Sequence, residues 1–199
     1  MKFNPLPASF YDREPRDVAR DLLGKILLRR ERGKLLAGRI VEVEAYLGAE
    51  DAAAHAAAGR TARNDVLFGP PGRAYVYFIY GNHYCFNVSC LPDGDAGGVL
   101  VRALEPVLGV EEMARARGLP ADQIRKIASG PGKLAEALGI TRARDNGKDL
   151  TSRKSDLCIG DDGSGPPPVQ VTKRIGITKA ADMPLRYIVS ENPFVSRKV

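Results

Sequence analysis

The residues best suited to chemistry lie close together in the segment RIVEVEAY, residues 39–46. Side chains alternate between the two faces of a strand, so Glu42, Glu44 and Tyr46 are expected to share one face. A carboxylate on the wall of a cleft can accept a proton from water or stabilise a developing positive charge. The same alternation is typical of a half-exposed strand with a solvated acidic face, and the segment alone favours this second interpretation.

A second group of chemically useful side chains is aromatic and lies in AYVYFIYGNHYCF. Two strand-forming runs flank Gly81 and Asn82, a pair that can adopt the positive φ angles of a tight hairpin turn. Tyr75 and Tyr77 would share one face of the hairpin, and Tyr80 would lie at its tip. Aromatic residues in strands usually pack. A tip offers little core to pack against, so Tyr80 is also a candidate wedge between base pairs.

Metal chemistry has little support in the sequence, which contains two histidines and three cysteines. Glu44, Asp51 and His55 could be imagined as three ligands, but their spacing matches no zinc pattern. A lone histidine in a loop is more often a hydrogen-bonded loop residue than a ligand. The cysteines contain no C-x2-C pair, which argues against a structural zinc site or a disulfide framework and favours a reducing, intracellular setting.

The net charge of +6 indicates a polyanionic partner, with nucleic acid first and an anionic membrane second. Arg60 and Arg63 lie in a loop, Arg102 on a later strand, and Lys133 after a Ser-Gly-Pro-Gly turn. Each could hold a phosphate, and each could equally be a solvated surface charge. No apolar run reaches the length of a transmembrane helix, and no signal peptide is evident, so no membrane association is expected.

The elements that must position these residues follow from periodicity and turn signals. A helix is expected before Gly24, and an irregular segment at 47–72. The other expected elements are strands at 25–30, 35–47 and 99–106, the aromatic hairpin, helices at 107–118 and 129–140, and final strands at 171–178 and 184–190. No repeat or separable linker interrupts them. The sequence therefore predicts one α+β domain over residues 1–199, with a curved, mainly antiparallel sheet, flanking helices and a protruding β-hairpin.

Together these segments resemble the alkyladenine (3-methyladenine) DNA glycosylase family. The resemblance rests on RIVEVEAYLGAEDAAAH, RNDVLFGPPGRAYVYFIYGNHYCFNVSC, VLVRALEP and SGPGKL, and the ending RIGITKAADMPLRYIV is also similar. These stretches run from about the first helix to the C-terminal strands. EAYLG followed by the YVYFIYG hairpin is long enough to be specific.

The resemblance implies a role for each matching residue. Glu44 corresponds to the general base that activates water, and Tyr46 and Tyr77 to the aromatic residues that stack on either side of a flipped base. His55 corresponds to a residue that lines the base pocket, hydrogen-bonding the base edge or positioning it through the backbone. No metal or organic cofactor is implied.

Three further residues match positions that handle the DNA. Tyr80 corresponds to the side chain that fills the gap left by the flipped nucleotide. Asn87 corresponds to a pocket residue that excludes normal guanine by crowding its exocyclic amine. Arg102 corresponds to a basic residue near the catalytic water and the target-nucleotide backbone. The chain departs from some relatives at Asn82, where a larger apolar side chain can stand beside the wedge.

The implied activity is that of a monofunctional glycosylase acting as a monomer on double-stranded DNA with alkylated or deaminated purines. A lyase step needs an amine nucleophile, and residues 44–87 contain no lysine, so an abasic site is the expected product. Three alternatives are a non-catalytic damaged-DNA-binding module, a metal-dependent hydrolase using Glu44, Asp51 and His55, and a structural domain whose aromatic residues are core.

Overall fold

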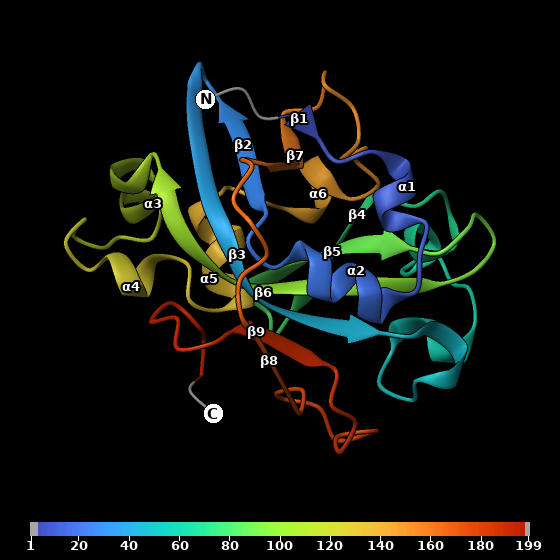
Figure 1. Ribbon diagram of the computed structural model, residues 1–199. Helices are drawn as coiled ribbons and strands as arrows, with labels where there is room; N and C mark the ends of the chain where they lie inside the picture. The colour runs from blue at the N-terminus through green and yellow to red at the C-terminus, as the bar shows by residue number, and fades with distance from the viewer. Residues whose placement is uncertain (1–3, 198–199) are drawn as a thin grey trace.

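The computed structural model describes residues 4–197, which are organised around one curled antiparallel sheet (Figure 1). The strand order is β1-β7-β2-β3-β6-β5-β4, and β9 pairs with both β3 and β8. The strands are β1 (Asn4–Pro5), β2 (Ile26–Glu31), β3 (Lys34–Tyr46), β4 (Ala74–Ile79), β5 (His83–Cys90), β6 (Gly97–Leu108), β7 (Leu157–Asp161), β8 (Val169–Thr172) and β9 (Arg186–Val189). The predicted α+β class with a curved antiparallel sheet is confirmed.

Short helices flank the sheet, with α3 and α4 on the left in Figure 1 and α1 and α2 on the right. They are α1 (Ala8–Tyr11), α2 (Pro15–Leu22), α3 (Val110–Ala116), α4 (Ile124–Ile127), α5 (Pro131–Ala137) and α6 (Arg142–Asp145). In α2 the Glu14 side chain accepts from the Arg16 N–H, and Val18 and Leu22 are buried. The helix ends just before Gly24, whose φ is +86°, as the sequence predicted.

Strand β3 is the centre of the sheet, because β6 pairs along one edge and β2 and then β9 along the other. The β3–β6 register skips Val41 on one strand and Arg102 on the other. Such bulges bend a strand and change which side chains share a face. Val43 nevertheless packs in the main core, and Glu42 and Glu44 both face Arg102, as strand alternation predicted.

The segment expected to be irregular, 47–72, forms three short 3-10 helices: η1 (Gly48–Glu50), η2 (His55–Ala58) and η3 (Asp65–Phe68). The aromatic hairpin forms as β4 and β5, but the predicted positions of the turn are wrong. Positive φ angles fall on Tyr80 (54°) and Gly81 (73°) rather than on Gly81 and Asn82. The Asn82 N–H closes the turn on the Ile79 carbonyl, so Tyr80 and Gly81 are its two central residues.

One expectation fails near the C-terminus. The strand predicted at 171–178 ends at Thr172, and Arg174 turns inward to a buried ion pair with Asp51. Strand β7, which pairs with β2, was not among the strands expected from the sequence. Residues 1–3 and 198–199 of the predicted domain lie outside the described residues.

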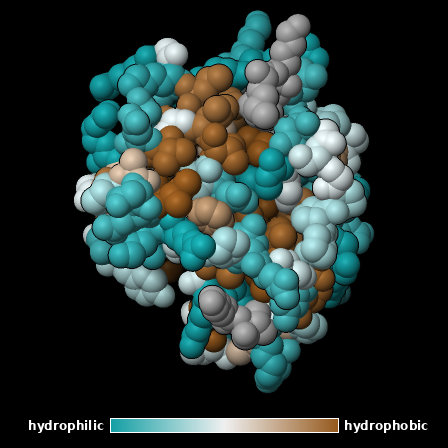
Figure 2. All heavy atoms as spheres, turned by 60° about the vertical axis from the view of Figure 1, so that its left-hand side comes forward, coloured by the Kyte–Doolittle hydropathy of each residue, from teal (hydrophilic) through white to brown (hydrophobic). Residues whose placement is uncertain are grey.

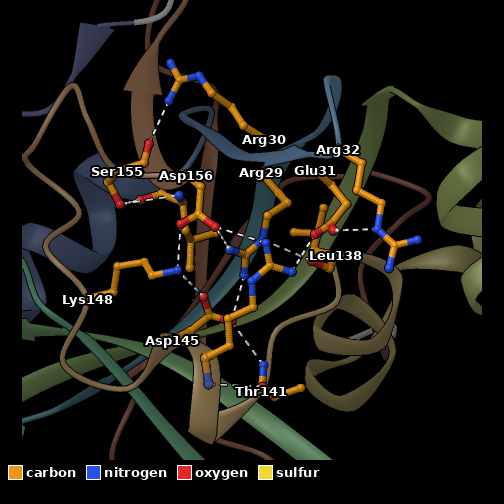
Figure 3. Close-up of polar contacts among 12 residues, drawn as sticks. Arg29, Arg30, Glu31, Arg32, Leu138, Thr141, Asp145, Lys148, Ser155 and Asp156 are labelled. Atoms are coloured by element: carbon orange, nitrogen blue, oxygen red, sulfur yellow. Dashed lines mark hydrogen bonds and ion pairs between the residues drawn. The ribbon is translucent and has the colours of Figure 1, made fainter.

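A buried ion cluster attaches the chain after α5 to the sheet (Figure 3). The Arg29 side chain has no exposed surface and donates to Asp145 at 2.7 Å, Asp156 at 3.1 Å and the Leu138 carbonyl at 3.2 Å. Lys148 donates to both carboxylates. Strand β2 therefore holds α6 and the lead into β7 through ion pairs as well as through the apolar core.

The surface is largely polar on the face that α3 and α4 present, with apolar atoms gathered in its upper and middle part (Figure 2). Within residues 4–197, no helix combines the length and the apolar character needed to cross a bilayer.

Candidate active site

A cavity of about 540 Å³ opens where the end of β3, the β4–β5 hairpin, η2 and the start of α5 meet. Its volume falls in the range of small-molecule sites. We call this cavity the pocket. It brings together most of the side chains singled out in the sequence: Tyr46, His55, Tyr77, Tyr80, Asn87, Arg102 and Lys133.

Glu44 lies directly behind the pocket wall and has no exposed surface. Its Oε2 accepts from the Tyr46 hydroxyl at 3.0 Å and from Arg102 Nη1 at 3.3 Å, and its Oε1 accepts from the Ile175 N–H at 2.8 Å. All three donors belong to residues that line the pocket. A carboxylate offers about four acceptor positions, so one position, on Oε1, is left for a further donor.

The interpretation of the β3 acidic face as solvated is wrong, because Glu42 and Glu44 are both fully buried. Burial raises the pKa of Glu44, and the neighbouring Glu42 adds to that rise. Arg102, the Ile175 N–H and the Tyr46 hydroxyl act in the opposite direction without cancelling the burial. A carboxylate with a raised pKa is a stronger base, which suits it to accept a proton near neutral pH.

Arg102 joins the two carboxylates. Its Nε donates to Glu42 Oε1 at 3.0 Å while its Nη1 reaches Glu44. Glu42 in turn accepts from Arg186 at 2.8 Å and from the Ser196 N–H at 2.5 Å. Arg102 is thereby fixed in the pocket wall, with its side chain about a tenth exposed.

The aromatic part of the pocket is built by β3, β4 and η2. The His55 and Tyr77 rings meet edge to face, with centroids 4.5 Å apart. The Tyr75 hydroxyl lies 2.8 Å from His55 Nδ1, and the Tyr75 and Tyr77 rings are 5.5 Å apart. Burial, followed by the charge on Glu44, raises the pKa of Tyr46, so its hydroxyl stays protonated and can donate to that carboxylate.

His55 belongs to a loop that is held together by Asn64, a residue the sequence did not single out. The buried Asn64 amide donates to the His55 and Gly59 carbonyls at 2.8 and 2.9 Å, and its carbonyl accepts from Thr61. His55 itself keeps exposed surface at the pocket. Desolvation, and secondly the charge of Arg63, lower the pKa of His55, which favours the neutral imidazole at pH 7.

The ligand set of the metal-dependent alternative is not brought together. Both carboxylate oxygens of Asp51 accept from Arg174, at 2.5 and 2.8 Å, and this ion pair is fully buried. Across the described residues, 4–197, no three His, Cys, Asp or Glu side chains cluster as metal ligands. Asp51 instead anchors the loop that carries Ile175 to Glu44.

Asn87 and Cys85 lie on β5 opposite the two tyrosines of β4. The register pairs Tyr75 with Asn87 and Tyr77 with Cys85. The Asn87 amide donates to the Tyr75 carbonyl at 3.1 Å, which fixes the side chain in the pocket. Burial raises the pKa of the Cys85 thiol, so the thiol is protonated at neutral pH.

Of the predicted DNA-contacting residues, Tyr80, Arg102 and Lys133 line the pocket. Tyr80 is 80% exposed at the hairpin tip. Arg60 and Arg63 are exposed and do not line the pocket, whereas the exposed Lys133 does. Arg60 pairs with Asp65, and the Arg63 guanidinium lies 5.7 Å from the centroid of the Tyr77 ring.

Two further residues of the site were not singled out in the sequence. The Arg174 guanidinium lies near the Tyr46 ring, and the Ile175 N–H donates to Glu44. The available signal for both was the stretch RIGIT, which was noted for its resemblance and expected to be a strand. A loop N–H that contacts a carboxylate 131 residues away leaves no local pattern.

Comparison with known proteins shows the family to which the chain is related. Residues 9–193 match the family model described as methylpurine-DNA glycosylase (MPG). A Koribacter versatilis protein named "Putative 3-methyladenine DNA glycosylase" is 71% identical over 194 residues, covering 98% of this chain and 94% of the relative. Proteins of the same name from Burkholderia lata and Methanoculleus marisnigri are each 50% identical. The first match covers 98% of this chain and 92% of the relative, and the second covers 97% and 99%.

Proposed function

The chain belongs to the methylpurine-DNA glycosylase family, and we propose on this basis that it hydrolyses the N-glycosidic bond of damaged purines in DNA during base excision repair. Its substrates are alkylated or deaminated purines, and its product is an abasic site. The observation that carries the proposal is Glu44, a buried carboxylate held by three donors behind a pocket with aromatic walls.

We propose that the pocket receives one base turned out of the duplex. Tyr46 and Tyr77 line it and offer ring faces for stacking, which is how flipped bases are commonly gripped. His55 presents its neutral ring to the base edge. Asn87, fixed by the Tyr75 carbonyl, crowds the position that the exocyclic amine of normal guanine would take.

Glu44 then acts as the general base. Cleavage of an N-glycosidic bond passes through a sugar with oxocarbenium character, and a nearby carboxylate stabilises that charge. The oxygen of a water bonds to the anomeric carbon as the base leaves with the electron pair of the broken bond, one proton of that water passes to Oε1 of Glu44, and the other stays on the new sugar hydroxyl. Because Glu44 has no exposed surface, this water enters between Tyr46, Arg102 and Ile175 as the nucleotide is bound.

DNA is held from outside the pocket. Tyr80 at the hairpin tip fills the gap left in the stack, which offsets part of the cost of unstacking. Arg60, Arg63 and Lys133 contact phosphates around the mouth, and Arg102 contacts the target nucleotide from the wall. We further propose that residues 1–199 form one domain that acts as a monomer, because one flipped base occupies one pocket, and that it works where the cell keeps its DNA.

The alternatives explain fewer of the contacts. A module that only binds damage has no use for a buried carboxylate with one open acceptor position, since burying a charge is costly. A structural domain would bury its aromatic residues, whereas Tyr80 is 80% exposed.

The test is release of bases from end-labelled duplexes that carry one hypoxanthine, one etheno-adenine or one alkylated purine. We expect strand breaks only after alkali treatment, with and without chelator. Breaks that form without alkali would contradict the monofunctional assignment. Loss of base release in chelator would favour the metal-dependent hydrolase.

A further inference from the structure

Two of the four tyrosines that line the pocket, Tyr46 and Tyr77, each have a guanidinium near the ring. The Arg174 Cζ lies 4.7 Å from the centroid of Tyr46, and the Arg63 Cζ lies 5.7 Å from the centroid of Tyr77. Both tyrosines line the pocket and neither arginine does. The cations therefore contact the rings from outside the space that a base would occupy.

The two guanidiniums differ in how their charge is balanced. Arg174 is fully buried and forms a bidentate ion pair with Asp51, so its charge is neutralised within the protein. Arg63 is exposed and has no ion-pair partner among residues 4–197. Arg63 is thus an unbalanced charge next to an aromatic wall of the pocket.

The remaining charges behind the pocket are also balanced. Glu42 and Glu44 accept from Arg102, and Glu42 accepts from Arg186 as well. A positively charged base entering the pocket would therefore meet no unpaired carboxylate. It would approach Tyr77, whose ring already interacts with a cation.

We propose that Arg63 is a specificity-determining residue that lowers the affinity of the pocket for cationic alkylated purines relative to neutral damaged purines. The inference rests on the proposed glycosylase function and concerns the same pocket. An aromatic ring attracts cations through its electron-rich face. The Arg63 guanidinium already interacts with the Tyr77 ring, so the ring attracts a second cation less. The guanidinium also repels a cationic base directly, whereas a neutral purine stacks without this repulsion. Specificity then arises from a repulsive element rather than from an added contact.

The surroundings of Arg63 fit this role better than a phosphate contact alone. Tyr77 contacts His55 at 4.5 Å between ring centroids, and His55 contacts the Tyr75 hydroxyl. The charge of Arg63, after desolvation, helps to lower the pKa of His55 and so keeps this ring neutral. A neutral imidazole at the base edge adds no charge of its own, so the charge of Arg63 adds to that of the exposed Lys133 in the pocket lining.

The experiment compares two lesions in one duplex sequence, 7-methylguanine as the cationic base and hypoxanthine as the neutral one. Fluorescence anisotropy gives the Kd of each duplex, and of the undamaged duplex, for proteins carrying Glu44→Gln to prevent turnover. Arg63→Gln and Arg63→Lys are made in that background. Arg60→Gln is the matched control, because Arg60 is also exposed but pairs with Asp65 and lies 5.9 Å from Phe68 instead of a pocket tyrosine.

We expect Arg63→Gln to shift the ratio of the two affinities toward 7-methylguanine by about 3- to 10-fold, the effect of one nearby exposed charge. Arg63→Lys should keep the original ratio, and Arg60→Gln should change both affinities by the same factor. Equal weakening of both lesions in Arg63→Gln would overturn the inference and leave Arg63 as a phosphate contact. If the Arg63-containing protein already binds damaged and undamaged duplexes equally, the proposed function fails as well.

Discussion

Arg102 is the residue through which the two carboxylates of β3 influence each other. It contacts Glu42 and Glu44 at once because a bulge displaces it from the β3–β6 register. Strand alternation was enough to predict that the carboxylates share a face. Their burial could not be predicted, because it depends on Arg186, Ser196 and Ile175, which come from the distant C-terminal part of the chain.

The pH dependence of base release tests this arrangement. Arg102 lowers the pKa of Glu44, which burial raises, so Arg102→Met should raise that pKa further. A protonated carboxyl accepts no proton, so activity is lost as the pH falls through the pKa of Glu44. The acidic limb of the single-turnover rate profile should therefore move to higher pH in Arg102→Met, with a rate at pH 7 reduced by about tenfold or more.

Arg186→Met is the matched control for this prediction. Arg186 is equally buried and contacts Glu42, but it makes no contact with Glu44. The acidic limb of the Arg186→Met rate profile should lie at the same pH as that of the unaltered protein. A limb that does not move in Arg102→Met would mean that Glu44 does not govern the pH dependence.

The hairpin of β4 and β5 shows what a single element contributes. The sequence predicted its two strands and the exposed position of Tyr80, because aromatic alternation around a glycine is a strong local signal. It did not predict that Tyr80 itself has a positive φ of 54°. An aromatic residue held in this conformation without core contacts is costly, which indicates a role outside folding.

Tyr80→Asn separates folding from DNA binding. Asparagine tolerates positive φ, so the free energy of unfolding should stay the same or rise by up to about 1 kcal/mol. The affinity for a duplex with one hypoxanthine should fall by about tenfold because the wedge is lost. Urea unfolding and anisotropy measure the two effects. A destabilised variant with unchanged affinity would instead favour the structural-domain alternative.

The segment between α5 and β7 shows the limit of sequence-based prediction at this scale. No element was predicted there, yet Arg29 on β2 binds Asp145 and Asp156 across 116 and 127 residues of chain (Figure 3). No periodic pattern marks such contacts, since the charges that meet are far apart in sequence.

Arg29→Met should leave Asp145 buried with fewer donors. Removing one partner of a buried ion pair costs about 3–5 kcal/mol, so the midpoint of urea unfolding should fall markedly. Arg30→Met is the control, because Arg30 is exposed and donates only to the Ser155 carbonyl in the described contacts. Equal unfolding midpoints in the two variants would show that the cluster does not stabilise the fold.

At the scale of the whole molecule, the net charge of +6 predicted a polyanionic partner but not where the partner binds. The fold places the exposed Lys133 in the pocket lining and the exposed Arg63 near Tyr77, while internal arginines pair with carboxylates. Net charge alone cannot separate these two groups, because an arginine that is paired inside the protein counts the same as one free to meet a phosphate.

Salt dependence tests the exposed group. Each phosphate contact changes the slope of log K against log salt concentration by about 0.9 in duplex DNA. Lys133→Gln should therefore reduce the slope by about one while leaving the preference for hypoxanthine over an undamaged site unchanged. Lys173→Gln, which removes an exposed lysine paired with Asp182, should not alter the slope. An unchanged slope in Lys133→Gln would remove Lys133 from the DNA interface.

The most direct test of the account is the single-turnover rate of hypoxanthine release by Glu44→Gln, measured beside Glu42→Gln. Both residues are fully buried on one face of β3, and both accept from Arg102. Only Glu44 also accepts from Tyr46 and Ile175, which line the pocket. We predict that Glu44→Gln loses about 10²- to 10⁴-fold in rate while it still binds the damaged duplex, and that Glu42→Gln loses far less. Equal losses in both variants, or base release that persists in Glu44→Gln, would contradict the assignment of Glu44 as the base that activates water.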